Sequence, residues 1–237
     1  MGKTTESDIR SALESLPTGS DAYDQAYEEA MEPITEQDVD GERLAKKVLS
    51  WITCARRPLI TAELQHAIAI RPGTSEFDKK SQPDLEDMIS VCAGLVTVDE
   101  ESNIIRLVHY TTQEYFERTQ ERWFPDAETK ITQTCVTYLL FDAFDSGRCS
   151  TYERFKARLR ENTLYDYAAQ NWGHHARAAS TEVAQLILGL LESEAKLSAS
   201  NQVILSPKSY SWRFSCSEGA PKQMTGVHVV AYFGLIE

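Results

Sequence analysis

The stretch DMISVCAGLVTVDEESNIIRLVHYTTQEYF, residues 87–116, decides the fold. Two β-branched runs, LVTV and IIRLV, are joined by five polar residues at 99–103, which predicts a β-hairpin although its loop lacks glycine. A helical pattern precedes the hairpin, and Gly94 is placed to end that helix in the left-handed conformation. After the hairpin, Thr111 and Glu114 fit a capping box, which predicts the start of another helix.

Two further helical patterns lie upstream of this stretch. Residues 42–56 place apolar side chains on one face at helical spacing. Thr61 is a plausible N-cap for the next helix, which the sequence Arg-Pro-Gly at 71–73 ends. Three helices followed by a hairpin are the order of a winged helix-turn-helix. The sequence therefore predicts a winged-helix domain over residues 41–120.

The chain on either side of this domain is also helical in pattern. Residues 6–16 and 21–31 indicate two short helices, and Pro33 is expected to stop the second. A helical domain is expected at 121–195, followed by a connector at 196–224 with one short helix at most. The predicted fold class is mainly α, a winged helix followed by a helical bundle. Helical patterns in that bundle fall at 127–144, 151–160, 164–177 and 181–192.

Composition limits the partners. The formal net charge is -12 and the pI about 4.9, so the surface as a whole repels phosphates, and neither nucleic acid nor an anionic membrane is expected as a main partner. No apolar run approaches the ~20 residues of a membrane span, and the polar N-terminus carries no secretion signal. Five cysteines without a C-x-x-C pair favour reduced thiols in an intracellular, cytoplasmic protein.

Two charged features bear on a DNA-binding role. The third helix of the winged helix carries Asp84, Glu86 and Asp87, and the hairpin tip carries three more carboxylates at 99–101, where DNA-binding relatives need cations. DNA binding is therefore disfavoured. The segment 148–161 is locally basic, which indicates a solvated face or, alternatively, a docking surface for an acidic neighbour in the same parent protein. Its cations are Arg148, Arg154, Lys156, Arg158 and Arg160.

No motif indicates catalysis. The GKTT sequence at 2–5 lacks the preceding strand and the first glycine of a phosphate-binding loop. His174 and His175 are neighbours, which project roughly 100° apart on a helix and cannot share one metal ion as an i, i+4 pair can. No nucleophile elbow or catalytic triad is evident. We expect a protein that is not an enzyme, with no cofactor and no metal site.

Three stretches in order carry a family resemblance. Residues 48–70, 87–116 and 164–177 closely resemble the winged-helix and following helical region of fungal NACHT–ankyrin proteins. These belong to the STAND class of signalling NTPases, and the module is often labelled a GPI inositol-deacylase winged-helix domain. The resemblance implies a non-catalytic regulatory and protein-interaction segment that couples a nucleotide-binding domain to an ankyrin array. Its partners would be the NACHT-type and ankyrin domains of the same parent protein.

Both ends of the chain extend the resemblance. Residues 1–35 are similar to the helical end of a NACHT module, although Pro33 departs from that pattern. Residues 225–237 resemble the opening of an ankyrin repeat, and because they make up less than half of one repeat we expect a truncated first repeat. This end is expected either to be loosely ordered or to pack Val227, Val229 and Phe233 on the preceding helices. The matching positions of the ankyrin motif are Thr225, His228, Ala231 and Gly234.

One histidine gains a candidate role from the resemblance. STAND winged-helix domains often carry a Met-His-Asp motif after the wing, whose histidine contacts the phosphate of a bound nucleotide. His109 matches that histidine, while Val108 and Tyr110 replace its neighbours. His109 is thus a nucleotide-sensing candidate where a NACHT domain is present, and otherwise caps or packs under the next helix. The alternative functions are a stand-alone protein-binding adaptor, a DNA-binding protein and a regulator of a lipid hydrolase.

Overall fold

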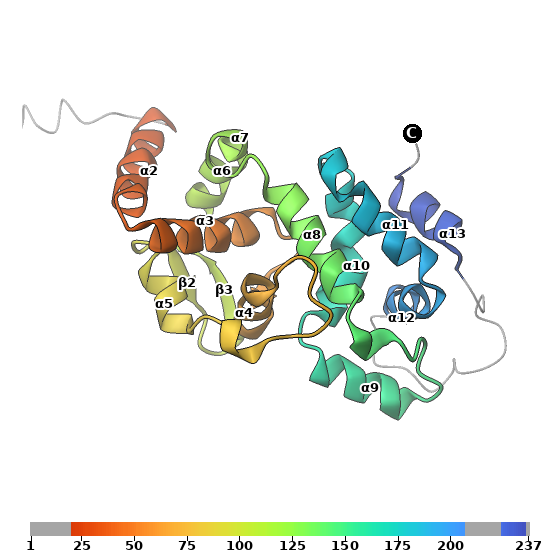
Figure 1. Ribbon diagram of the computed structural model, residues 1–237. Coiled ribbons are helices and arrows are strands. Elements are labelled where there is room, and N and C mark those ends of the chain that lie inside the picture. The colour runs from red at the N-terminus through yellow and green to blue at the C-terminus, as the bar shows by residue number, and fades with distance from the viewer. Residues whose placement is uncertain (1–19, 207–223, 236–237) are drawn as a thin grey trace, which may run out of the picture.

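The computed structural model describes residues 20–206 and 224–235, and it has the expected mainly α class. A winged helix occupies one end of the molecule and a helical body the other (Figure 1). The winged helix consists of α3 (Val39–Cys54), β1 (Leu59–Ile60), α4 (Thr61–Ala69), α5 (Leu85–Ser90), β2 (Val96–Val98) and β3 (Ile104–Leu107).

The predicted hairpin is confirmed, and a third strand joins it. β3 lies between β1 and β2, and both pairs are antiparallel, with Leu59 opposite Ile105 and Val96 opposite Leu107. The loop manages without glycine because Asn103 adopts the left-handed conformation, with φ 55°. The Asp99 carboxylate accepts the two backbone N–H groups at 101 and 102, which holds the loop in shape.

The glycine prediction holds, and the two capping predictions do not. Gly94 has φ 80°, as expected. Thr61 is the first residue of α4 and not its N-cap, and the Glu63 carboxylate accepts the Ile60 N–H at 3.1 Å. The helix α6 (Tyr110–Arg118) begins one residue before Thr111. The Thr111 hydroxyl is hydrogen-bonded to the Tyr27 hydroxyl at 2.6 Å, so the expected capping box does not form.

The helix α2 (Ser20–Thr35) continues through Pro33, so the prediction that this proline ends the helix is wrong. Proline removes one hydrogen bond and disturbs the preceding turn. Here Met31 and Ile34 are fully buried on either side of it, and their packing holds the last turn helical. The helix predicted at 6–16 and the GKTT sequence lie outside the described residues.

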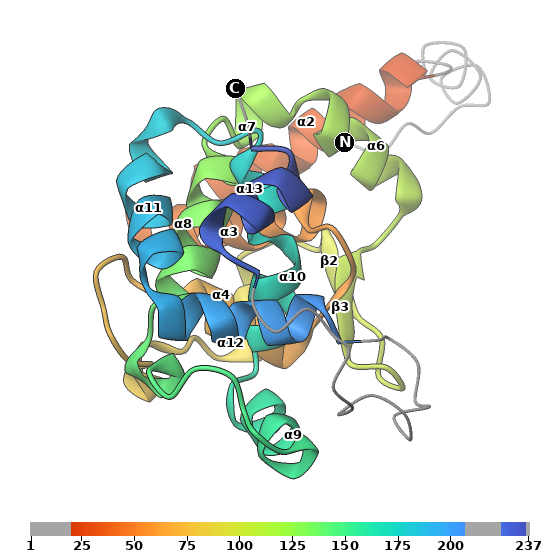
Figure 2. The same cartoon turned by 90° about the vertical axis from the view of Figure 1, so that its right-hand side faces the viewer.

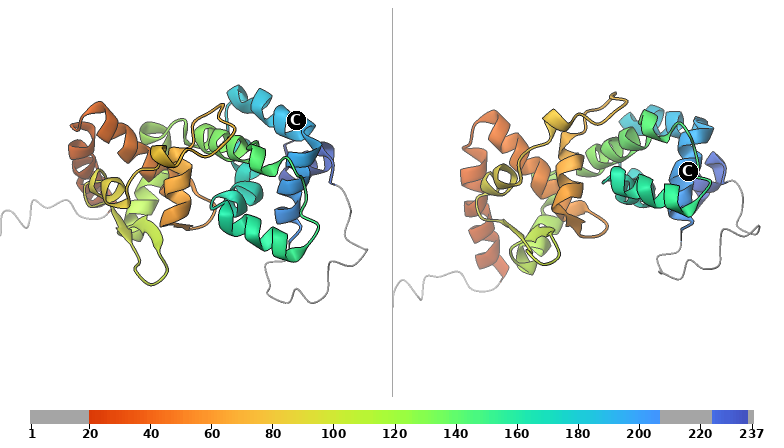
Figure 3. Two further views of the ribbon diagram at one scale, coloured as in Figure 1. Left: turned by 60° about the horizontal axis from the view of Figure 1, so that its bottom comes forward. Right: turned by 90° about the horizontal axis from the view of Figure 1, so that it is seen from below.

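The helical body is built around α10 (Tyr165–Ala176), whose Tyr165, Tyr167 and Trp172 are fully buried. α10 packs most extensively against α8 and also against α12, while α9 projects from the body (Figures 1 and 2). Figure 3 shows the winged helix and this body side by side from two further directions. The other helices are α7 (Gln120–Trp123), α8 (Ala127–Leu139), α9 (Tyr152–Glu161), α11 (Ala184–Glu192) and α12 (Glu194–Ile204), with 3-10 turns at 79–81, 142–144 and 181–183.

The C-terminal stretch is helical and packed. α12 occupies the start of the expected connector and buries Leu197 and Val203. Further on, α13 (Gly226–Phe233) buries Val229 and Phe233, which lie four residues apart on one face. Val227 is 77% exposed, so its expected packing is wrong, because two residues along a helix point to nearly opposite faces. Across the described residues, none of these helices is both long and apolar enough to cross a membrane.

Candidate functional site: a basic groove beside the wing

A groove of about 460 Å³ runs along β3, between the start of α6 and the segment that joins α3 to β1. His109, Val108 and Tyr110 all line it, so His109 and the two residues that replace the Met and Asp of the motif lie on one surface. His109 occupies the N-cap position of α6, and its side chain makes no capping hydrogen bond. The imidazole is exposed and faces the groove without acting as a cap.

The groove is lined by basic side chains. Arg56, Arg57 and Arg106 join His109 there, and none of the described lining residues is acidic, although the chain carries 36 carboxylates. The N-terminus of α6, which has no side-chain cap, opens at the same place and contributes a partial positive charge. The uncapped N-terminus of α6 and the exposed His109 ring suit an anion, whereas each of the three arginines already has a carboxylate partner outside the groove lining.

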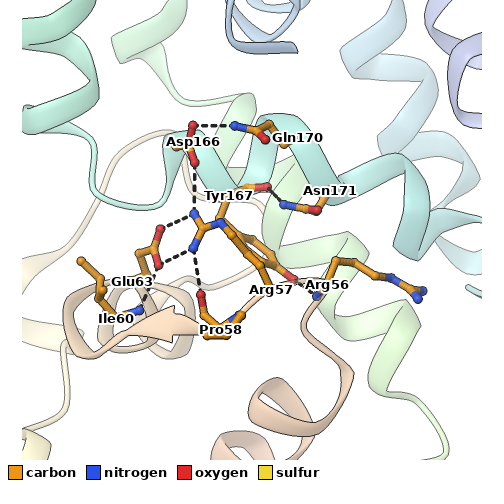
Figure 4. Close-up of polar contacts among 9 residues, drawn as sticks. All are labelled: Arg56, Arg57, Pro58, Ile60, Glu63, Asp166, Tyr167, Gln170 and Asn171. Atoms are coloured by element: carbon orange, nitrogen blue, oxygen red, sulfur yellow. Dashed lines mark hydrogen bonds and ion pairs between the residues drawn. The ribbon is translucent and has the colours of Figure 1, made fainter. Parts of the chain in front are cut away.

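Arg57 is committed to the structure (Figure 4). Its guanidinium donates two hydrogen bonds to Glu63, at 2.9 and 2.6 Å, and one to Asp166 at 3.1 Å. It also lies over the Tyr167 ring, 5.2 Å from the centroid. Hydrogen bonding to Glu63 raises the pKa of Arg57 above its ordinary value. Arg57 therefore joins α4 to α10, and two carboxylates already neutralise its charge.

Arg56 is held more loosely and points elsewhere (Figure 4). Its guanidinium Nη2 donates to Glu128 Oε1 at 3.1 Å and to the His174 carbonyl at 3.3 Å. Its backbone N–H donates to the Tyr167 hydroxyl at 3.1 Å. The Arg56 side chain is 42% exposed, so a ligand that reached it would compete with Glu128 and the His174 carbonyl for its guanidinium.

A buried polar chain continues from Arg56 into the helical body. His175 is fully buried, with Nδ1 2.5 Å from Glu128 Oε2 and Nε2 2.8 Å from the Tyr167 hydroxyl. The Tyr167 hydroxyl is thus shared between the Arg56 backbone N–H and Nε2 of His175. We call Arg56, Glu128, Tyr167, His174 and His175 the α10 junction.

The other motif residues lie far from this groove along the chain, on α13. Thr225 is the N-cap of α13, and its hydroxyl is 2.7 Å from Nδ1 of His228. Gly234 ends the helix in the left-handed conformation, with φ 66°, while Ala231 is exposed. Among the described residues, no group of three His, Cys, Asp or Glu side chains is arranged to hold a metal.

The sequence interpretation found His109 but not the arginines around it. Arg56 and Arg57 lie about fifty residues earlier, and the available signal was a pair of adjacent cations between two apolar segments. Arg106 alternates outward on β3, between two inward-facing apolar residues, as a solvated strand position does. A strand pairing between 59–60 and 104–105 would have placed all three arginines together.

Fold and groove define a winged helix with a basic surface beside its wing, and the match to a family model agrees on the winged helix. Residues 32–127 match the family model of the GPI inositol-deacylase winged helix domain. A curated relative, the azaphilone pigments biosynthesis cluster protein L of Monascus ruber, is 29% identical over 200 residues. That match covers 76% of this chain and 40% of the relative, so the chain spans about two fifths of its length. No solved structure matches the chain.

Proposed function

We propose that this chain is a non-catalytic regulatory segment of a STAND-type NACHT–ankyrin signalling protein, in which it couples a nucleotide-binding domain to an ankyrin array. The observation that carries the proposal is the position of His109 in a groove with three arginines and no described carboxylate in its lining. An anionic group presented by a neighbouring domain fits such a surface, and a nucleotide phosphate is the anion that a NACHT domain holds.

Other features support the same arrangement. The groove lies within the segment that matches the winged-helix family model, so it belongs to the module itself. At the opposite end, Thr225 is the N-cap of α13, its hydroxyl contacts His228 in the first turn, and Gly234 ends the helix, which supports the resemblance to the opening of an ankyrin repeat. The four described cysteines are free thiols, which supports an intracellular location.

The association with a NACHT domain is tested by binding. A matched NACHT fragment loaded with ADP is titrated with this chain, and with the His109→Ala variant. We expect binding that weakens about ten-fold in the variant, because one charge-assisted contact to phosphate contributes about 1.5 kcal/mol. Gln65→Ala, which lies outside the groove, is the matched control and should bind as the unchanged chain does.

Two results oppose the proposal. If the NACHT fragment fails to bind while another protein binds specifically, the adaptor alternative holds. Gel shifts with duplex DNA that weaken steeply with salt would favour the DNA-binding alternative. We expect no shift, because Glu86 and Asp87 stand in the first turn of α5, the helix that would enter the major groove.

A further inference from the structure

Phe233 is the larger of the two side chains, with Val229, that α13 buries against the helical body. Phe233 is 1% exposed and packs edge-on against Trp172 and His174, with ring centroids 5.1 and 5.0 Å apart. Its ring lies directly over Gly173 of α10, where an added Cβ would stand 2.1 Å from Phe233 Cγ. Position 173 therefore has to be glycine for this ring to lie there, and the fit of α13 depends on the last turn of α10.

The same turn of α10 also contacts Arg56. The carbonyl of His174 accepts from Arg56 Nη2, and His175 next to it binds Glu128, the other acceptor for that guanidinium. Phe233 and Arg56 thus both contact His174, Phe233 through the imidazole ring and Arg56 through the backbone carbonyl. A shift of this turn when Phe233 leaves would change both acceptors of the Arg56 side chain.

Arg56 is the only cation of the three in the described groove lining that bonds to this turn of α10. Arg57 is held by Glu63 and Asp166. The Nη2 atom of Arg106 lies 3.8 Å from Oδ2 of Asp99, on the hairpin. An anion in the groove must compete with Glu128 and with the His174 carbonyl for the Arg56 guanidinium. The packed position of α13 preserves that competition.

We propose that α13 is an inhibitory element for the groove: while Phe233 lies over Gly173, the α10 junction withholds Arg56 from an anion, and release of α13 frees it. This inference rests on the proposed anion contact of the groove. By thermodynamic reciprocity, an anion that binds Arg56 also loosens α13 by the same factor. Couplings of this kind typically change affinity 5- to 150-fold. Because this coupling acts through a single side chain, we expect a change in affinity of about five-fold, at the low end of that range.

The coupling is first tested without any ligand, through amide hydrogen exchange of residues 226–235. Arg56→Ala removes the donor to His174, and it should speed exchange in α13. Arg106→Ala is the matched control, because it removes a groove arginine whose ion pair is with Asp99 on the hairpin rather than with α10, and it should leave exchange in α13 unchanged. Equal exchange in the two variants would overturn the coupling, whether or not the groove binds anions.

The second arm measures pyrophosphate affinity by calorimetry at fixed salt. Phe233→Ala should raise the affinity about five-fold, while Val227→Ala, on the exposed side of the same helix, should not change it. In an Arg56→Ala background the effect of Phe233→Ala should vanish. Unchanged or weaker binding by Phe233→Ala contradicts the inhibitory role. No pyrophosphate binding by any variant contradicts the proposed function of the groove, and the exchange experiment then decides the coupling alone.

Discussion

The α10 junction and the docking of α2 join neighbouring elements by opposite means. In the junction, His175 is fully buried and the Glu128 side chain is 15% exposed. In the α2 interface, Arg118 holds Asp24 and Arg122 holds Glu28 across side chains that are 31–56% exposed. Buried hydrogen bonds are costly to break and insensitive to salt, whereas exposed ion pairs are weak and screened. The polar contacts of the α10 junction therefore form a firm joint, and the exposed ion pairs of the α2 interface form a loose one.

The largest effect is expected from a substitution in the apolar packing of α10, the helix that carries most of the firm joint. Trp172→Ala removes a fully buried ring from α10 and should lower the free energy of unfolding by about 3–5 kcal/mol, measured by urea denaturation. Trp123→Ala is the control, because that ring is only partly buried and should cost less. Equal losses of unfolding free energy would mean that Trp172 on α10 is no more tightly packed than Trp123 on α7.

Removing one hydroxyl tests the polar part of the junction. Tyr167→Phe leaves the Arg56 N–H and His175 Nε2 without their shared partner, so the free energy of unfolding should fall by about 1–3 kcal/mol. The loss should be the same at low and high salt. Tyr110→Phe, whose ring is 77% exposed, should have little effect. A loss that disappears with salt would place the junction in the same class as the α2 interface.

Lys47 on α3 is a half-buried charge. Its Nζ donates to the Ile68 carbonyl at 2.7 Å, and burial, together with Arg43, Lys130 and Arg71, lowers its pKa to about 8. Between pH 8 and the ordinary lysine value of 10.5, the unfolded chain holds a proton that the folded chain has lost. The stability contribution of this group therefore rises with pH across that window.

The consequence is a stabilising substitution. Lys47→Met should raise the free energy of unfolding by about 1–2 kcal/mol at pH 7, after the lost hydrogen bond to Ile68 is subtracted. The gain over the unchanged chain should shrink as the pH rises from 8 toward 10.5, as followed by urea denaturation at each pH. Lys156→Met on α9, an exposed lysine, should show no such trend. A gain that is independent of pH would refute the buried-charge explanation.

The smallest expected effect concerns the loose joint. Arg118→Ala removes the pair with Asp24 and should lower the melting temperature less than any destabilising change above. The difference should vanish at about 0.5 M salt, where screening is nearly complete. Arg154→Ala on α9 controls for the loss of an exposed arginine. A drop that persists at high salt would show that Arg118 acts through packing rather than charge.

Much of the fold could be predicted because it follows from local pattern. The hairpin, Gly94 and the helices around α8 and α10 carry their signals within a few residues. The capping box at Thr111 failed because Tyr27, 84 residues earlier, competes for that hydroxyl. The prediction that Pro33 ends α2 failed because the burial of Met31 and Ile34 outweighs the local cost of proline in a helix.

The candidate site was predictable only in part. His109 could be found because it follows the wing directly in sequence. Arg56 could not, since its place in the groove depends on strand pairing and on three contacts to α8 and α10. Phe233 was expected to pack, but nothing near Gly173 in the sequence identified it as the partner. A glycine inside a helical pattern indicates only a residue of low helix propensity.

The two-residue strand β1 has a consequence for the order in which the chain folds. Leu59 and Ile60 have partners only at Ile105 and Ile104, and the first N–H of α4 at Thr61 bonds to the carbonyl of Asn103. During synthesis, α3 and α4 leave the ribosome well before these partners exist. The hairpin closes locally and can form first. The groove is therefore assembled late, when the earlier half of the domain pairs with a finished wing.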